Sequence, residues 1–159
     1  MPRFAPVGTI AGTGYDHGFK AGAESHYGPE ANWDEMRRLV KAVDHRAFGF
    51  CCHIDGWSGT PEEKAQADRE AAPYVLHTHI PWTITEGLLV ERMNNLRNAG
   101  YQGYYSAELH TGRYEYALVG AMLGKIRAVL EDWRNGGTGD YLARPPRAGT
   151  GAPPAPGRP

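Results

Sequence analysis

Four pairs of ionisable side chains, each two positions apart, stand at the ends of short apolar runs in this sequence. They read Glu24-Ser25-His26, His53-Ile54-Asp55, His77-Thr78-His79 and Glu108-Leu109-His110. Residues i and i+2 of a strand share a face, so the two members of each pair would point the same way. A buried carboxylate is rare unless it is paired or bound to metal. The recurrence therefore predicts one polar centre, where side chains from neighbouring strands converge on an ion.

Four short strands and four amphipathic helices are expected to position these pairs. The strands are expected over residues 19–25, 48–54, 74–80 and 103–109. The first two helices carry start signals, because Asn32 has capping-box spacing to Glu35 and Thr60 precedes a proline and two glutamates. The other two carry apolar stripes: Leu89, Met93 and Leu96 after a start near Thr85, and Leu118, Met122, Ile126, Val129 and Trp133. Four βα units in a row imply parallel strands, as in a doubly wound sheet or a (β/α) barrel.

The polar strand ends favour the barrel, and their sequences resemble a known superfamily. The segments that carry the resemblance are Ala23-Glu24-Ser25-His26, residues 48–56, residues 72–80 and residues 96–108. They are similar to the C-terminal half of the xylose isomerase-like TIM barrels, which include sugar-phosphate isomerases and epimerases. The resemblance implies an α/β fold of four consecutive βα units, corresponding to the C-terminal half of a (β/α)₈ barrel.

The same resemblance implies a metal site and a reaction. Its ligands would be Glu24, Asp55, His79 and Glu108, with Glu24 and Glu108 also acting as acid and base. Three carboxylates and one imidazole suit Mn²⁺, Mg²⁺ or Co²⁺, with Zn²⁺ as an alternative. The implied function is isomerisation or epimerisation of a sugar or sugar phosphate through a metal-stabilised enediolate.

Further polar and aromatic residues near the strand ends are expected to bind the substrate. They are His26, His53, Trp57, His77, Trp82 and His110. The sequence departs from the family pattern at Ser58, where a histidine or asparagine is common, and at Ile80-Pro81-Trp82, where a lysine-acid pair often follows the ligand histidine. These departures leave the choice of substrate open.

The chain divides into an N-terminal extension (1–18), a half-barrel (19–134) and a disordered Gly/Pro-rich tail (135–159). Within the extension, Gly12-Thr13-Gly14 is interpreted as a flexible loop. A four-stranded half-barrel has two open edges, so a homo-oligomer or a complementary N-terminal half-barrel chain is expected as partner. Two alternatives to an isomerase stay open. One is a non-catalytic or partial subunit that completes a barrel with another chain, and the other is a keto-polyol dehydratase of the same superfamily.

Composition excludes several other classes. The formal net charge is −1, without a basic cluster, so we expect no nucleic-acid partner and place a DNA-repair nuclease well below the isomerase. No apolar run is long enough to span a bilayer, and no membrane partner is expected. The two cysteines, Cys51 and Cys52, are adjacent, so we expect two unpaired thiols in a buried strand of a cytoplasmic protein.

Overall fold

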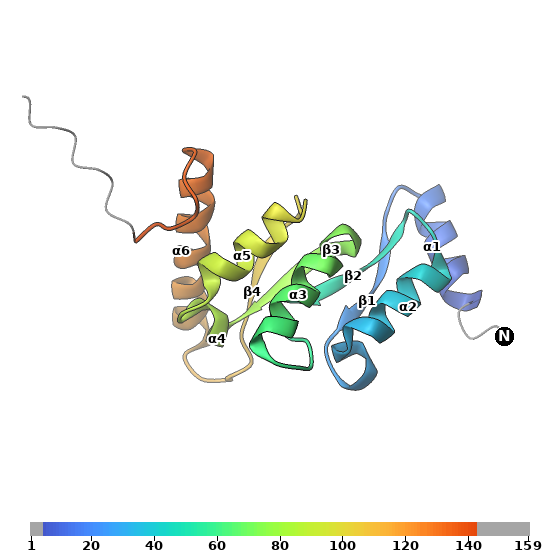
Figure 1. Cartoon of the computed structure of the whole chain (residues 1–159), viewed down its shortest axis with the longest axis horizontal. Helices are drawn as coiled ribbons and strands as arrows, with labels where there is room; N and C mark the ends of the chain where they lie inside the picture. Colours follow the sequence, from blue (N-terminus) through green and yellow to red (C-terminus); the bar gives the residue numbers. More distant parts are fainter. Residues whose placement is uncertain (1–4, 143–159) are drawn as a thin grey trace, which may run out of the picture.

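The computed structural model describes residues 5–142, which contain a four-stranded parallel sheet. Its strands are β1 (Ala21–Ser25), β2 (Phe48–His53), β3 (Val75–Pro81) and β4 (Tyr105–Glu108). They lie in chain order, β1-β2-β3-β4, and each neighbouring pair is parallel (Figure 1). The α/β class and the four predicted strands are therefore confirmed.

Helices precede, connect and follow the strands. The α-helices are α1 (Ala5–Asp16), α2 (Trp33–Val43), α3 (Pro61–Ala71), α4 (Trp82–Thr85), α5 (Leu89–Asn98) and α6 (Glu115–Arg134), with 3₁₀ turns η1 (Gly28–Ala31) and η2 (Ala72–Tyr74). The expected caps are present. Asn32 accepts the Glu35 N–H at 3.3 Å, and Thr60 and Glu63 form a reciprocal capping box. Local side-chain chemistry thus fixes where α2 and α3 begin.

The long helices follow one another across the sheet. Helix α2 contacts both α1 and α3, and α3 contacts α5. Figure 1 shows α2, α3 and α5 side by side along the strands, with α1 and α6 at the two ends of the row. The strands lie side by side in chain order. Right-handed crossovers between strands in this order place all the connecting helices on the same face of the sheet. A complete doubly wound sheet carries helices on both faces, whereas the connecting helices α2, α3 and α5 form a single row.

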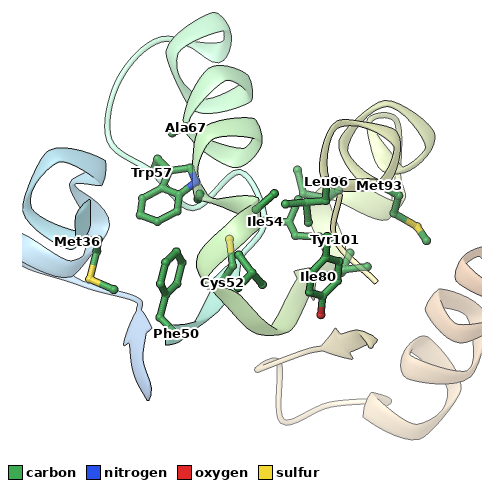
Figure 2. Close-up of a cluster of buried hydrophobic side chains, with 14 of the residues drawn as sticks. Met36, Phe50, Cys52, Ile54, Trp57, Ala67, Ile80, Met93, Leu96 and Tyr101 are labelled. Carbon is green, nitrogen blue, oxygen red and sulfur yellow. The ribbon is translucent and has the colours of Figure 1, made fainter. Parts of the chain in front are cut away.

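The hydrophobic core lies between this helical layer and one face of the sheet. In β2, Phe50 and Cys52 are completely buried. Met93 and Leu96 of α5 are also completely buried and belong to the same core (Figure 2). Strand residues alternate between faces, so the residues between the core positions point away from the helices. That opposite face therefore carries Glu24, His53, His77, His79 and Glu108.

The interpretation of Gly12-Thr13-Gly14 as a flexible loop is wrong, because these residues form part of α1. The helix packs against β1 and α2, and Ala11 is completely buried. A Cβ added at Gly14 would lie 3.0 Å from the backbone oxygen of Phe19. The glycine thus allows close approach to the chain that enters β1, and packing outweighs its low helix propensity.

The prediction of disorder from residue 135 onward is wrong for residues 135–142. Asp132 accepts the Gly139 N–H at 2.6 Å, and the Asn94 side chain donates to the Thr138 carbonyl at 2.7 Å. Tyr141 packs against the core cluster. Residues 135–142 therefore continue the packed structure, and the remainder of the predicted tail, 143–159, lies outside the described residues.

Two smaller expectations concern the cysteines and the membrane. Cys51 and Cys52 are both free thiols, as predicted, with Cys52 completely buried in the core. Burial raises the pKa of the Cys51 thiol to about 11, so this group is not a reactive thiolate at neutral pH. Within residues 5–142, no helix is both long and apolar enough to cross a bilayer.

Candidate metal centre

Four side chains, one from each strand, converge on the face of the sheet that the helices leave uncovered. They are Glu24, His53, His79 and Glu108, and each offers one ligand atom within 4.8 Å of all the others. The sheet register places His53 directly beside His79 on the two central strands. The glutamates lie on the two outer strands and have the longer side chains, which allows them to reach inward. The sequence prediction of one polar centre at the strand ends is confirmed.

The contacts within this group link every carboxylate to an imidazole. His53 Nε2 lies 2.9 Å from Glu24 Oε1, and His53 Nδ1 lies 3.2 Å from Glu108 Oε2. His79 Nδ1 lies 3.3 Å from Glu24 Oε1 and 3.2 Å from Glu108 Oε1. The hydrogen bond from His53 lowers the pKa of Glu24, more than burial raises it. The Glu24 carboxyl is therefore ionised at neutral pH.

The donor set fits a divalent cation. Two carboxylate oxygens and two imidazole nitrogens lie within 4.8 Å of one another, and such ligands bind Zn²⁺ and the first-row transition metals. Two carboxylates that approach the same imidazole also repel one another, and a cation between them relieves that repulsion. A divalent ion is therefore compatible with the residues that gather here.

Asp55, which the resemblance implied as a ligand, is absent from this group. Its carboxylate instead pairs with the buried guanidinium of Arg92 at 2.9 Å and lies 4.0 Å from Lys64 Nζ. Strand β2 ends at His53, and Asp55 has a left-handed backbone with φ of 62°. The two-residue alternation of a strand therefore no longer applies at Asp55. In this structure His53 stands in its place, although the sequence had suggested His53 only as a substrate-binding residue.

A buried acid on α3 holds the turn in which Asp55 lies. The carboxylate of Asp68 accepts the Asp55 N–H at 3.2 Å and the Trp57 indole N–H at 2.9 Å. Asp68 is completely buried, and this desolvation raises its pKa to about 7. Trp57 is only 2% exposed. Its ring therefore belongs to the core, and the expected contact of Trp57 with a substrate stays a prediction.

The outer histidines surround the group without joining it. The His26 ring stacks on that of His53, with 4.3 Å between centroids. His77, two residues before His79 in β3, lies on the same face of the sheet. Its Nε2 is 2.9 Å from Ser106 Oγ, and this contact orients the ring. His110 Nε2 lies 3.0 Å from Glu108 Oε1, and its side chain is 73% exposed.

Trp82, the second tryptophan predicted to contact substrate, begins α4 and remains partly accessible. Lys125 Nζ lies 5.7 Å from the centre of its ring, a cation–π contact that connects α4 to α6. The structure therefore gives Trp82 a packing partner on α6, and its predicted contact with substrate stays a prediction.

The choice between His53 and Asp55 as ligand can be tested by metal affinity. We expect His53→Ala to weaken Zn²⁺ binding by at least about 100-fold, because it removes a nitrogen from the centre. Asp55→Asn should leave the dissociation constant within about threefold, since Asp55 faces Arg92. Isothermal titration calorimetry on each variant measures both values, with His17→Ala, an exposed histidine, as the matched control. Loss of binding in Asp55→Asn alone would restore the ligand set implied by the resemblance.

Comparison with known proteins identifies no relative of this chain. No family model matches the sequence, and neither a curated protein nor a solved structure matches it.

Proposed function

We propose that this chain forms four βα units of a TIM-barrel-type fold and contributes the metal centre of a sugar or sugar-phosphate isomerase or epimerase. The observation that carries the proposal is the convergence of Glu24, His53, His79 and Glu108 from four consecutive parallel strands. In barrels of this type, catalytic residues come from the carboxyl ends of several strands. The helices on one face and the polar residues on the other support the same arrangement.

The four residues would hold a divalent ion through two oxygens and two nitrogens. With His53 in place of Asp55, this set favours Mn²⁺, Co²⁺ or Zn²⁺ over Mg²⁺, which prefers oxygen ligands. A bound ion supplies positive charge that stabilises the oxyanion formed when the carbon beside a carbonyl loses its proton.

The two glutamates are suited to move that proton. They approach the centre from β1 and β4, the opposite edges of the sheet, so a substrate between them would present one face to each. Glu24 is ionised and its side chain is 45% exposed, which allows it to accept a proton from a molecule that enters from solvent. Glu108 is 18% exposed and is well placed to return a proton from the other side.

A partial subunit is the second candidate, and the open sheet edges favour it. Within the described residues, β1 and β4 each have a strand partner on one side only. A homo-oligomer or a complementary half-barrel chain that supplies further strands would cover these edges and the polar face. This partner stays a prediction, as does the cytoplasmic location. The keto-polyol dehydratase begins with the same proton removal and differs in its product.

Hydrogen exchange in D₂O tests the proposed reaction. We expect the chain loaded with Mn²⁺, Co²⁺ or Zn²⁺ to replace the hydrogen beside the carbonyl of a ketose, an aldose or one of their phosphates with deuterium. Proton NMR follows the loss of that signal, after Mn²⁺ or Co²⁺ is removed by chelator from quenched samples. Mass spectrometry separates isomerisation from a dehydration that releases water.

The control for this experiment is the same chain after treatment with EDTA, which should be inactive. A chain that is shown to contain about one metal ion but exchanges no hydrogen on any of these compounds would contradict the isomerase and favour the partial subunit. A chain that binds no metal would contradict the centre itself.

A further inference from the structure

Within the metal centre, contacts at both ring nitrogens define the position of the His53 side chain. Its two nitrogens face two different carboxylates, with Nε2 toward Glu24 at 2.9 Å and Nδ1 toward Glu108 at 3.2 Å. A rotation of this ring about its bond to Cβ would break both contacts together. The orientation of the His53 ring plane therefore sets both of its carboxylate contacts.

Two consecutive residues at the end of β1 hold His53. Ser25 accepts the backbone N–H of His53 at 3.0 Å through its hydroxyl, which itself donates to the Cys51 carbonyl. The next residue, His26, stacks its ring on the ring of His53, with 4.3 Å between centroids and 20° between planes. Ser25 thus fixes the backbone of His53, and His26 lies against the face of its side chain.

The stack continues outward to the surface. The ring of Tyr27 lies on that of His26, with 3.6 Å between centroids and 25° between planes. Tyr27 is 71% exposed, whereas His53 is 8% exposed. The ring of His79 contacts that of His53 edge-on, at 4.8 Å and 77°. His53 is therefore confined by a stacked ring on its face and a perpendicular ring beside it, and nearly parallel packing opposes its rotation.

We propose that His26, backed by Tyr27, is a positioning residue for the metal centre: its flat ring sets the plane of the His53 imidazole and so raises the affinity for the ion. This inference rests on the proposed metal centre, and it assigns His26 a role through stacking and not as a ligand or a substrate-binding group. Groups that orient a ligand histidine change metal affinity by about 10- to 100-fold in other metal sites.

Substitutions that keep or remove the flat ring test the proposal. His26→Ala is expected to weaken Zn²⁺ binding by about 10- to 100-fold, measured by competition with a chromophoric chelator. His26→Phe keeps a flat ring but has no ring nitrogen, so it should restore affinity to within about threefold of the wild type. Tyr27→Ala should give a smaller loss, since Tyr27 touches His26 and lies outside the contacts of His53. His17→Ala is the control.

A spectroscopic measurement separates positioning from a general loss of stability. With Co²⁺ as the probe, the visible absorption bands report the geometry of the ligands around the ion. We expect His26→Phe to keep the wild-type spectrum and His26→Ala to change it at saturating Co²⁺. Melting curves in EDTA show whether each variant is folded before metal is added, and Tyr27→Ala, at an exposed position, serves if His26→Ala does not fold.

The outcomes distinguish this inference from the proposal on which it rests. Wild-type affinity in His26→Ala would overturn the positioning role while leaving the metal centre intact. Equal losses in His26→Phe and His26→Ala would overturn stacking as the cause and assign the effect to a ring nitrogen. A wild-type chain that binds neither Zn²⁺ nor Co²⁺ would instead contradict the metal centre.

Discussion

Addition of Zn²⁺ or Mn²⁺ to the metal-free chain is expected to raise its melting temperature by roughly 5–10 °C at about 100 times the dissociation constant. An ion that binds only the folded chain stabilises it by about 2.7 kcal/mol at that concentration. For a chain of this length, each kcal/mol corresponds to roughly 2–4 °C. The ion would join four strands that are far apart in sequence, so the unfolded chain offers no comparable site. Differential scanning fluorimetry measures the shift, and EDTA should reverse it.

A variant that lacks two donors is the control for this shift. Glu108→Ala combined with His79→Ala removes one oxygen donor and one nitrogen donor from the centre, on strands β4 and β3. Both side chains lie on the polar face of the sheet, away from the core, so the metal-free variant should stay folded. Its melting temperature should be insensitive to either ion. An equal shift in this variant would mean that the ion binds elsewhere, and no shift in the wild type would contradict the centre.

Local sequence signals predicted the four strands and the starts of α2 and α3 correctly, because these features depend on neighbouring residues. Asn32 and Thr60 cap their helices with side-chain oxygens that accept backbone N–H groups three residues later. The short, mostly apolar run from Phe48 to Ile54 predicted the strand that the structure contains as β2. Chain order then brought the strand ends together, because each crossover in a row of βα units leads to the adjacent strand. The polar centre thus followed from periodicity alone.

The identity of the fourth residue could not be read in the same way. Whether Asp55 or His53 faces the centre depends on where β2 ends and on Arg92, which is 37 positions further along the chain. Arg92 is 2% exposed, and a buried guanidinium without a counter-charge is very unfavourable. Asp55 supplies that charge together with Glu91. To predict this pairing requires the position of α5 relative to the turn after β2, and sequence periodicity does not give that position.

The N-terminal helix α1 was missed for a similar reason. Its glycines lower the intrinsic preference for a helix, and the segment lacks a strong amphipathic pattern. Packing against β1 and α2, with Ala11 buried and Gly14 close to Phe19, supplies the stabilisation that local propensity does not. Tertiary contact, and not local sequence, therefore decides the conformation of residues 5–16.

Replacing Glu24 or Glu108 by glutamine is expected to separate the two halves of the proposed proton transfer. Glutamine keeps an oxygen for the ion but cannot take up a proton, so each variant should lose about 10²- to 10⁴-fold in the step that its glutamate performs. The glutamate that faces the substrate hydrogen is needed for exchange in D₂O, and its partner is needed to form product. Rates are compared at saturating metal, with the metal content of each variant measured.

The diagnostic result is an exchange of roles when the reaction is started from the other side. If two glutamates act on opposite faces, one variant should lose both hydrogen exchange and product formation from a given substrate, while the other loses product formation alone. Starting from the product should reverse which variant keeps exchange, because the hydrogen then faces the other glutamate. Glu131→Gln, an exposed glutamate on α6, is the matched control. Equal losses of exchange from both sides in both variants would mean that these carboxylates bind the ion without moving the proton.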